Sequence, residues 1–101
     1  MRMLMQVRVP NETFNAAIRK GTAQATMQQI LEEIRPEAAY FTTEEGKRSA
    51  LLVVDLPTAK SMCAMAEPWF LAFQAEVDFR PIMSAEDIAQ ADLAEIGKKW
   101  A

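Results

Sequence analysis

The chain has 101 residues, a length typical of one domain, and we expect that domain to span residues 1–101. Half of its residues are hydrophobic, a quarter are charged and the net charge is -3, which is typical of a globular protein. The basic residues form no cluster, which argues against nucleic-acid binding, and no apolar run approaches the ~20 residues of a membrane span.

The chain has no histidine and a single cysteine, Cys63. The first absence excludes Ser-His-Asp and Cys-His nucleophile systems as well as His-ligated zinc and haem, and we expect no cofactor. One cysteine cannot form an internal disulfide, and the N-terminal residues lack the pattern of a signal peptide. We therefore expect a cytoplasmic protein with no membrane or nucleic-acid partner.

Residues 2–9 predict a β-strand with one apolar face, because every second side chain is large and apolar. Pro10 ends this strand, since proline cannot donate a hydrogen bond to a neighbouring strand. The next residue, Asn11, is typical of a helix N-cap. The apolar face of the strand consists of Met3, Met5, Val7 and Val9.

Residues 12–34 have a helical composition, but their apolar side chains form two stripes that point in roughly opposite directions. One explanation is a break near Gly21, because glycine costs about 1 kcal/mol relative to alanine inside a helix. The alternative is one long helix that contacts both its own sheet and a partner. Both alternatives stay open.

Residues 38–56 predict a β-hairpin. Two strand-like segments flank a turn at residues 44–47, where Gly46 can adopt a positive φ. Residues 51–54 are apolar on both faces, which is typical of a central strand that is covered on two sides.

A second helix is predicted from Pro57, which suits a first turn, to Pro68, which is expected to end it. The apolar stripe of this helix includes Cys63, which we interpret as a small buried hydrophobic residue. An aromatic elbow at residues 68–73 then leads into a strand at residues 75–81. The full stripe of the helix is Ala59, Met62, Cys63 and Ala66.

The C-terminal region predicts one more helix. Ser84 and Asp87 have the spacing of a capping box at its start. Its apolar stripe predicts that its end docks on another surface. The stripe consists of Ala89, Leu93, Ile96 and Trp100.

The element order predicts an α+β fold. Right-handed crossovers give a ferredoxin-like βαββαβ split unit plus a C-terminal helix, with a four-stranded antiparallel sheet in the order 4-1-3-2 and both helices on one face. The other face is partly apolar, so we expect a second subunit to cover it and to bury ~1,600 Å² or more. The charged residues of that face are expected to pair within or across the two sheets. They are Arg2, Arg8, Glu76, Asp78 and Arg80.

The stretch from residue 51 to residue 81 resembles a known superfamily. It contains a strand that ends in Val-Val-Asp, a helix, an elbow Pro68-Trp69-Phe70 and a strand Glu76-Val77-Asp78. This pattern is similar to the dimeric α+β barrel superfamily, which includes muconolactone isomerase, YCII-related domains and small antibiotic-type monooxygenases. Outside this stretch only the order of elements matches. The resemblance implies a homodimer or higher homo-oligomer with a pocket between the sheet and its helices.

Two carboxylates are candidate catalytic residues. Glu76 and Asp78 share a strand face, and paired carboxylates can act as acid and base when burial separates their pKa values. The alternative is that they form salt bridges with Arg8 or Arg80. Either arginine is also a candidate for binding the carboxylate of a ligand through a bidentate pair of hydrogen bonds.

Three aromatic residues are candidate ligand-binding residues. The phenol of Tyr40 can donate a proton or a hydrogen bond, although tyrosine is also common on edge strands for its shape. Trp69 and Phe73 follow Pro68, where they form either an aromatic lip over a pocket or ordinary core.

These features support three hypotheses. The first is a homodimeric α+β barrel protein with an apolar pocket for a small organic ligand. The second is an isomerase or cofactor-free oxygenase that acts on a small cyclic or aromatic acid, in which Arg8 binds the anion and Asp78 or Glu76 transfers protons. The third is a non-catalytic association module whose pocket is filled by its own side chains. The sequence leaves open whether the chain is an enzyme.

Overall fold

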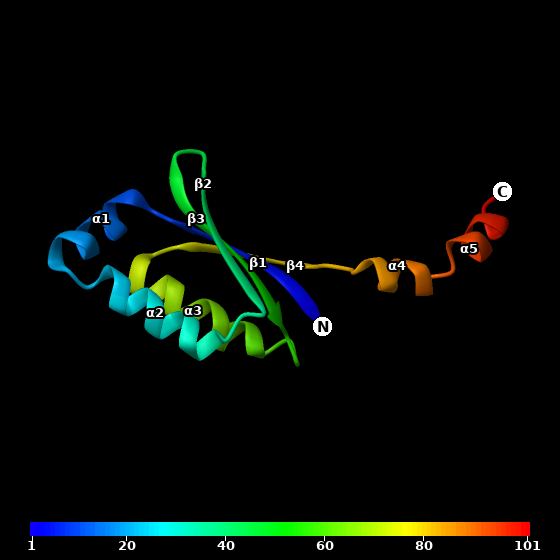
Figure 1. Ribbon diagram of the computed structural model, residues 1–101, viewed down its shortest axis with the longest axis horizontal. Helices are drawn as coiled ribbons and strands as arrows, with labels where there is room; N and C mark the ends of the chain where they lie inside the picture. Colours follow the sequence, from blue (N-terminus) through cyan, green and yellow to red (C-terminus); the bar gives the residue numbers. More distant parts are fainter.

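The computed structural model describes residues 1–101 and contains one four-stranded sheet and five helices (Figure 1). The strands are β1 (Arg2–Val9), β2 (Ala38–Glu44), β3 (Lys47–Asp55) and β4 (Glu76–Pro81). The helices are α1 (Asn11–Lys20), α2 (Ala23–Ile34), α3 (Ser61–Phe73), α4 (Ala85–Gln90) and α5 (Leu93–Lys99). The strand order is β2-β3-β1-β4 and every pairing is antiparallel. The predicted α+β class and four-stranded antiparallel sheet are confirmed.

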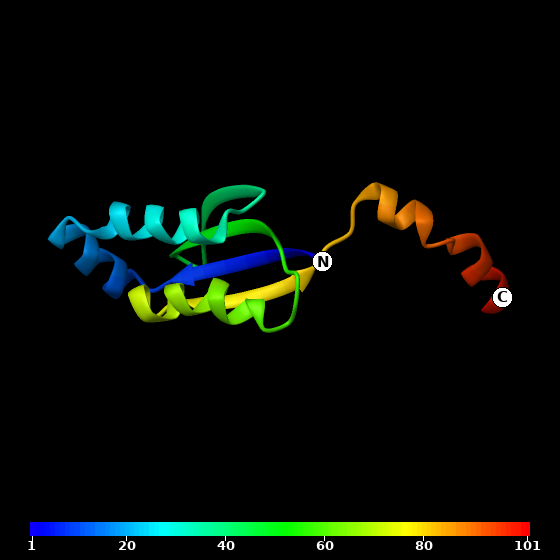
Figure 2. The same cartoon turned by 90° about the horizontal axis from the view of Figure 1, so that it is seen from below.

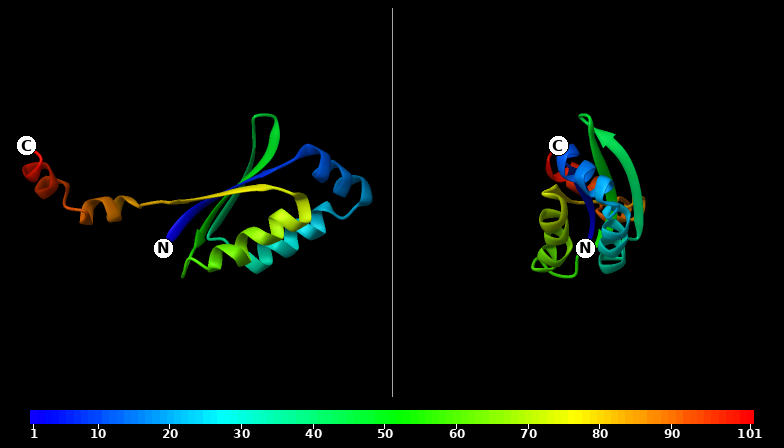
Figure 3. Two further views of the ribbon diagram at one scale, coloured as in Figure 1. Left: turned by 180° about the vertical axis from the view of Figure 1, so that it is seen from behind. Right: turned by 90° about the vertical axis from the view of Figure 1, so that its left-hand side faces the viewer.

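One face of the sheet carries the hydrophobic core. Met5, Val7 and Leu52 are fully buried there, as the alternation in β1 predicts. The first three helices cover this face, and α2 and α3 lie side by side (Figure 3). Their main contributions to the core are Phe14 of α1, Ile30 and Ile34 of α2, and Trp69 and Phe73 of α3.

The helical region after β1 is broken at Gly21, which settles the first open alternative. Gly21 has φ 77°, a left-handed conformation that glycine adopts without a steric penalty, and its N–H bonds back to the carbonyl of Ile18 at 2.9 Å. The N-cap prediction for Asn11 is wrong. Asn11 is the first residue of α1, and its side chain instead donates to the carbonyl of Gly46 at 3.0 Å, which ties α1 to the hairpin.

The hairpin between β2 and β3 is confirmed. Its two-residue turn is formed by Glu45 and Gly46, both with positive φ (51° and 78°). This geometry is typical of a type I′ turn, whose twist matches that of the flanking strands. Because the turn sets the register, Phe41 lies opposite Ala50 and therefore on the same sheet face as the core.

Helix α3 differs from its predicted form. It begins at Ser61 rather than near Pro57, and it continues through Pro68 to Phe73, so the predicted aromatic elbow is helical. Continuation costs one backbone hydrogen bond but places two large aromatic side chains in the core, which favours the longer helix. Of the predicted stripe only Ala66 is buried, together with Trp69 and Phe73, and Cys63 is exposed rather than buried.

The opposite face of the sheet is not covered by the helices. Leu4, Leu51 and Val53 lie at its centre and are half-buried in the single chain. We refer to this surface, formed by the outward side chains of all four strands, as the open sheet face.

Residues 82–101 form a C-terminal arm that extends away from the rest of the molecule (Figures 1 and 2). Every residue from Ala85 to Ala101 is exposed. The radius of gyration is 17.1 Å, compared with about 13 Å for a compact domain of this length, and the longest dimension is 60 Å.

The capping box at the start of the arm is confirmed, because Ser84 Oγ accepts from the N–H of Asp87 at 3.1 Å and Asp87 accepts from the N–H of Ser84 at 2.9 Å. The prediction of a single last helix is wrong. Asp92 adopts φ 54° and divides the arm into α4 and α5. None of the five helices has both the length and the apolar character needed to cross a membrane.

Candidate functional site

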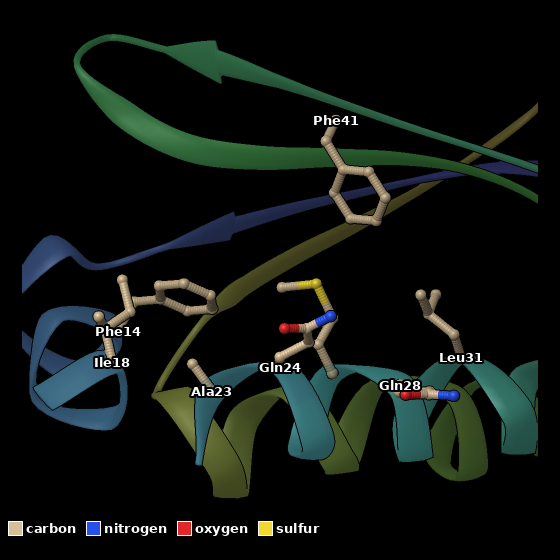
Figure 4. Close-up of a pocket in the computed structure, with 8 residues that line it drawn as sticks. Phe14, Ile18, Ala23, Gln24, Gln28, Leu31 and Phe41 are labelled. Atoms are coloured by element: carbon tan, nitrogen blue, oxygen red, sulfur yellow. The ribbon is translucent and has the colours of Figure 1, made fainter. Parts of the chain in front are cut away.

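The most extended apolar hollow in the structure is a groove between the helices and the hairpin, with a volume of about 480 Å³ (Figure 4). Helices α1 and α2 form one wall and β2 forms the other. Six of its eight lining residues are hydrophobic. They are Phe14 and Ile18 of α1, Ala23, Met27 and Leu31 of α2, and Phe41 of β2, with the amides of Gln24 and Gln28 completing the wall.

The groove is open because its walls do not meet. Phe41 projects from the hairpin towards α2, while Phe14 and Leu31 project into the same space from the other wall (Figure 4). Phe41 and Ile18 remain 55% and 50% exposed, although both are large apolar side chains. Apolar surface that is held in a concave arrangement is typical of sites for small organic molecules.

Arg48 lies next to this groove on the core side of the sheet. It is opposite Val9 and Thr43 in the sheet register, two pairs along from Phe41 and Ala50 and therefore on the same face of the sheet. Its Cζ atom lies 4.8 Å from the centre of the Phe14 ring, which lines the groove. Its Nη1 atom is buried and has no hydrogen-bond partner.

A separate polar cluster lies on the open sheet face. Arg8 Nη1 donates to Asp78 Oδ2 at 2.8 Å, and Arg8 Nε is 3.2 Å from Glu44 Oε1. These hydrogen bonds, the one to Asp78 first, raise the pKa of the Arg8 guanidinium. Gln6 Nε2 also donates to Glu44. The side-chain oxygen of Ser49, which is 3% exposed beside Arg8 in the register, has no partner.

The predicted charged site residues lie on this face, away from the groove. Asp78 is bonded to Arg8, whereas Glu76 and Arg80 are exposed and form no ion pair within the chain. Arg2 is bonded to Glu37 at 3.0 Å. The predicted pairing within the sheet is therefore present for one of the three arginines that were expected to take part.

Of the three predicted aromatic site residues, Tyr40 is separated from Trp69 and Phe73. Tyr40 lies on the open sheet face, opposite Leu51, and is 67% exposed. Trp69 and Phe73 are 0% and 1% exposed in the core, with ring centres 6.4 Å apart, and neither lines the groove. Of the two interpretations offered for this pair, the position of both rings agrees with ordinary core.

The resemblance implied a pocket between the sheet and its helices, but the residues that line this groove were not named from the sequence. Alternation in residues 38–43 places Phe41 on the face opposite Tyr40, and this signal was available. No local pattern indicates that Arg48 lies close to Phe14, because the two residues are brought together only when α1 packs on the hairpin.

No family model matches the chain, and no curated protein matches it. No group of three or more Cys, Asp or Glu side chains is arranged to hold a metal ion.

Proposed function

We propose that the chain forms a homodimer of the ferredoxin-like α+β barrel type and that its apolar groove binds a small organic ligand. The observation that carries the proposal of ligand binding is the groove of about 480 Å³, whose large apolar side chains remain exposed in a concave arrangement. A volume of this size lies within the range of ~300–1,000 Å³ that is typical of small-molecule sites.

Dimerisation is supported by the open sheet face. Leu4, Leu51 and Val53 come from the two central strands and form a continuous apolar surface, because they lie opposite or diagonally across the register. A second copy that presents the same surface would bury these side chains, and a two-fold axis makes the contact self-complementary. The strand order β2-β3-β1-β4 is compatible with such a barrel.

The C-terminal arm supports the same assembly. Leu93, Ile96 and Trp100 have the spacing of one helical stripe and are 60%, 48% and 79% exposed. A short helix has little stability by itself and depends on packing of its apolar face. Because the arm extends away from its own sheet, we propose that it packs on the partner copy.

Binding is a better supported role for the groove than catalysis. The isomerase-like and oxygenase-like alternatives require a proton-transferring group beside the ligand, and the lining residues of the groove include no carboxylate. Asp78 and Glu76 lie on the open sheet face, on the other side of the sheet from the core. Their catalytic role stays a prediction.

Calorimetric titration with a neutral aromatic probe, 2-naphthamide, tests the groove. Gln24→Trp places a large side chain in the groove from an exposed position of α2, and Gln29→Trp is the matched control because Gln29 is exposed on the same helix but does not line the groove. We expect wild type and Gln29→Trp to bind equally, and Gln24→Trp to bind about tenfold more weakly or worse.

Two outcomes would contradict binding in the groove. One is the absence of any binding heat with wild-type protein. The other is equal affinity of wild type and Gln24→Trp, which would show that the probe binds elsewhere.

A further inference from the structure

Arg48 is unusual among the arginines of the chain. It and Arg8 are the two that are half-buried, whereas the others are exposed. Arg8 has carboxylate partners in Asp78 and Glu44, but Arg48 has no carboxylate within 4.0 Å. Its Nη1 atom is excluded from solvent without any hydrogen-bond partner. A buried donor on a charged group that lacks an acceptor is unfavourable, and such a group in a native protein requires an explanation.

The aromatic neighbour of Arg48 explains only part of this arrangement. The Phe14 ring, 4.8 Å from Arg48 Cζ, attracts the positive charge through its π-electron face. A phenyl ring is a poor substitute for the carboxylate or carbonyl oxygen that a guanidinium N–H ordinarily bonds. The ring therefore positions the guanidinium and leaves its hydrogen-bonding capacity for another group.

Arg48 is close to two residues that line the groove. Phe14, which it contacts, lines the α1 end of the groove, and Phe41 lines the hairpin side two register pairs away from Arg48, on the same face of the sheet. Arg48 does not itself line the groove, so a molecule between Phe41 and α2 would meet its guanidinium at the end where Phe14 lies. No acidic side chain lines the groove to compete for that cation.

From this arrangement we infer that the groove selects organic acids, with an apolar body between Phe41, Met27 and Leu31 and a carboxylate that accepts hydrogen bonds from Arg48. This inference rests on the proposed function of the groove and adds the ligand class and the residue that recognises it. Arginine is suited to this role because its planar guanidinium matches the geometry of a carboxylate. The site is distinct from Arg8, whose guanidinium is already bonded to two acids.

The test compares 2-naphthoate with 2-naphthamide, two probes of nearly the same shape that differ in charge, by calorimetric titration. We expect wild-type protein to bind the acid about tenfold more tightly than the amide or better. Arg48→Met keeps an apolar stem but removes the charge, so we expect it to lose the preference for the acid and to bind the two probes equally. Arg35→Met is the matched control, since Arg35 is exposed, has no carboxylate partner and does not line the groove.

A second measurement observes Arg48 in the wild-type protein. In wild-type protein with 15N-labelled arginine, 2-naphthoate is expected to shift the side-chain resonance of Arg48, and 2-naphthamide to leave it in place. Assignment uses Arg48→Lys, which keeps the charge and is expected to retain part of the preference for the acid.

The outcomes separate this inference from the proposed function. Equal affinity of wild type for both probes, with Gln24→Trp weakening both, overturns the selection of acids but leaves the groove as a binding site. A preference for the acid that persists in Arg48→Met, or an Arg48 resonance that does not move, assigns the anion to another residue and also overturns the inference. If neither probe binds wild-type protein, both the inference and the proposed function fail.

Discussion

Arg8 and Asp78 form a 2.8 Å hydrogen-bonded ion pair across strands β1 and β4, although they are not opposite one another in the register. Arg8 lies opposite Glu76, and Asp78 lies opposite Gln6, so the guanidinium reaches its diagonal neighbour. Its Nε atom lies 3.2 Å from Oε1 of Glu44, in β2 on the far side of β3. One arginine thus links the two edge strands of the sheet across its open face.

Replacement of Arg8 by Met is expected to lower the melting temperature by a few degrees, because the two edge strands lose their common partner. The loss should be smaller in about 1 M sodium chloride, since salt screens partly exposed ion pairs. Thermal melts followed by circular dichroism at low and high salt measure both effects. Arg80→Met, which removes an exposed arginine without an ion pair, serves as the control, and an equal loss in the two variants would contradict the linking role of Arg8.

Phe73→Ala is expected to destabilise the protein by about 3–5 kcal/mol, as measured by urea denaturation. Phe73 is 1% exposed, and its ring centre lies 5.2 Å from that of Phe14 and 6.4 Å from that of Trp69. The matched substitution Phe70→Ala, at a residue of α3 that is 40% exposed, is expected to cost less than about 1.5 kcal/mol. Similar losses at both positions would mean that Phe73 is not part of the core.

The capping box of α4 is expected to respond to pH. Two hydrogen bonds from Ser84, the one from its backbone N–H first, lower the pKa of Asp87. A group whose pKa is lowered by folding stabilises the folded form above its ordinary pKa of about 3.9, and this contribution is lost as the pH falls through the lowered value. We therefore expect the first turn of α4 to fray at acidic pH, which backbone NMR shifts can follow.

Variants of Ser84 separate the two causes of this pKa shift. Ser84→Ala removes only the hydroxyl, so a 13C NMR titration of the Asp87 carboxyl should show a pKa that returns part of the way to its ordinary value. Ser84→Pro also removes the backbone donor and is compatible with the observed φ of -80°. A pKa of Asp87 that stays fully lowered in Ser84→Pro would refute the capping explanation.

Leu51→Arg is expected to prevent dimerisation, because it places a charge at the centre of the open sheet face. Light scattering at micromolar concentration should give about twice the chain mass of 11.3 kDa for wild type and the single chain mass for the variant. Gln29→Arg, at an exposed position of α2, controls for the added charge. A wild-type mass of 11.3 kDa, or an unchanged mass in Leu51→Arg, would count against the proposed assembly.

The strands, the hairpin turn and the capping box of α4 could be predicted from local patterns. Alternation of large apolar residues identified the buried face of β1, Gly46 identified the hairpin turn, and Ser84 with Asp87 identified the capping box. Each of these features depends on side-chain period, φ or a hydrogen bond between residues no more than a few positions apart. Such preferences are already present in a short segment of chain.

Local patterns failed where long-range packing opposed them. Pro68 is a helix-breaking residue, yet α3 continues through it because Trp69 and Phe73 become buried. Asn11 is a favourable N-cap residue, yet its side chain bonds to Gly46, 35 positions away. In both cases a contact with residues distant in the sequence stabilises the observed structure. This stabilisation outweighs the local preference, for a helix break at proline or for an asparagine N-cap, which is worth about 1–3 kcal/mol or less.

The sequence by itself therefore determined the class of the fold, the strands of the sheet and which face of β1 is buried, because these follow from the period of the side chains. Only the tertiary structure decided that Arg8 bonds to Asp78 and Glu44, that the C-terminal arm lies away from its own sheet, and that Arg48 lies over Phe14 beside an open groove. The three side-chain contacts join residues between 34 and 70 positions apart, whose proximity depends on how helices and strands pack, and no local preference encodes it.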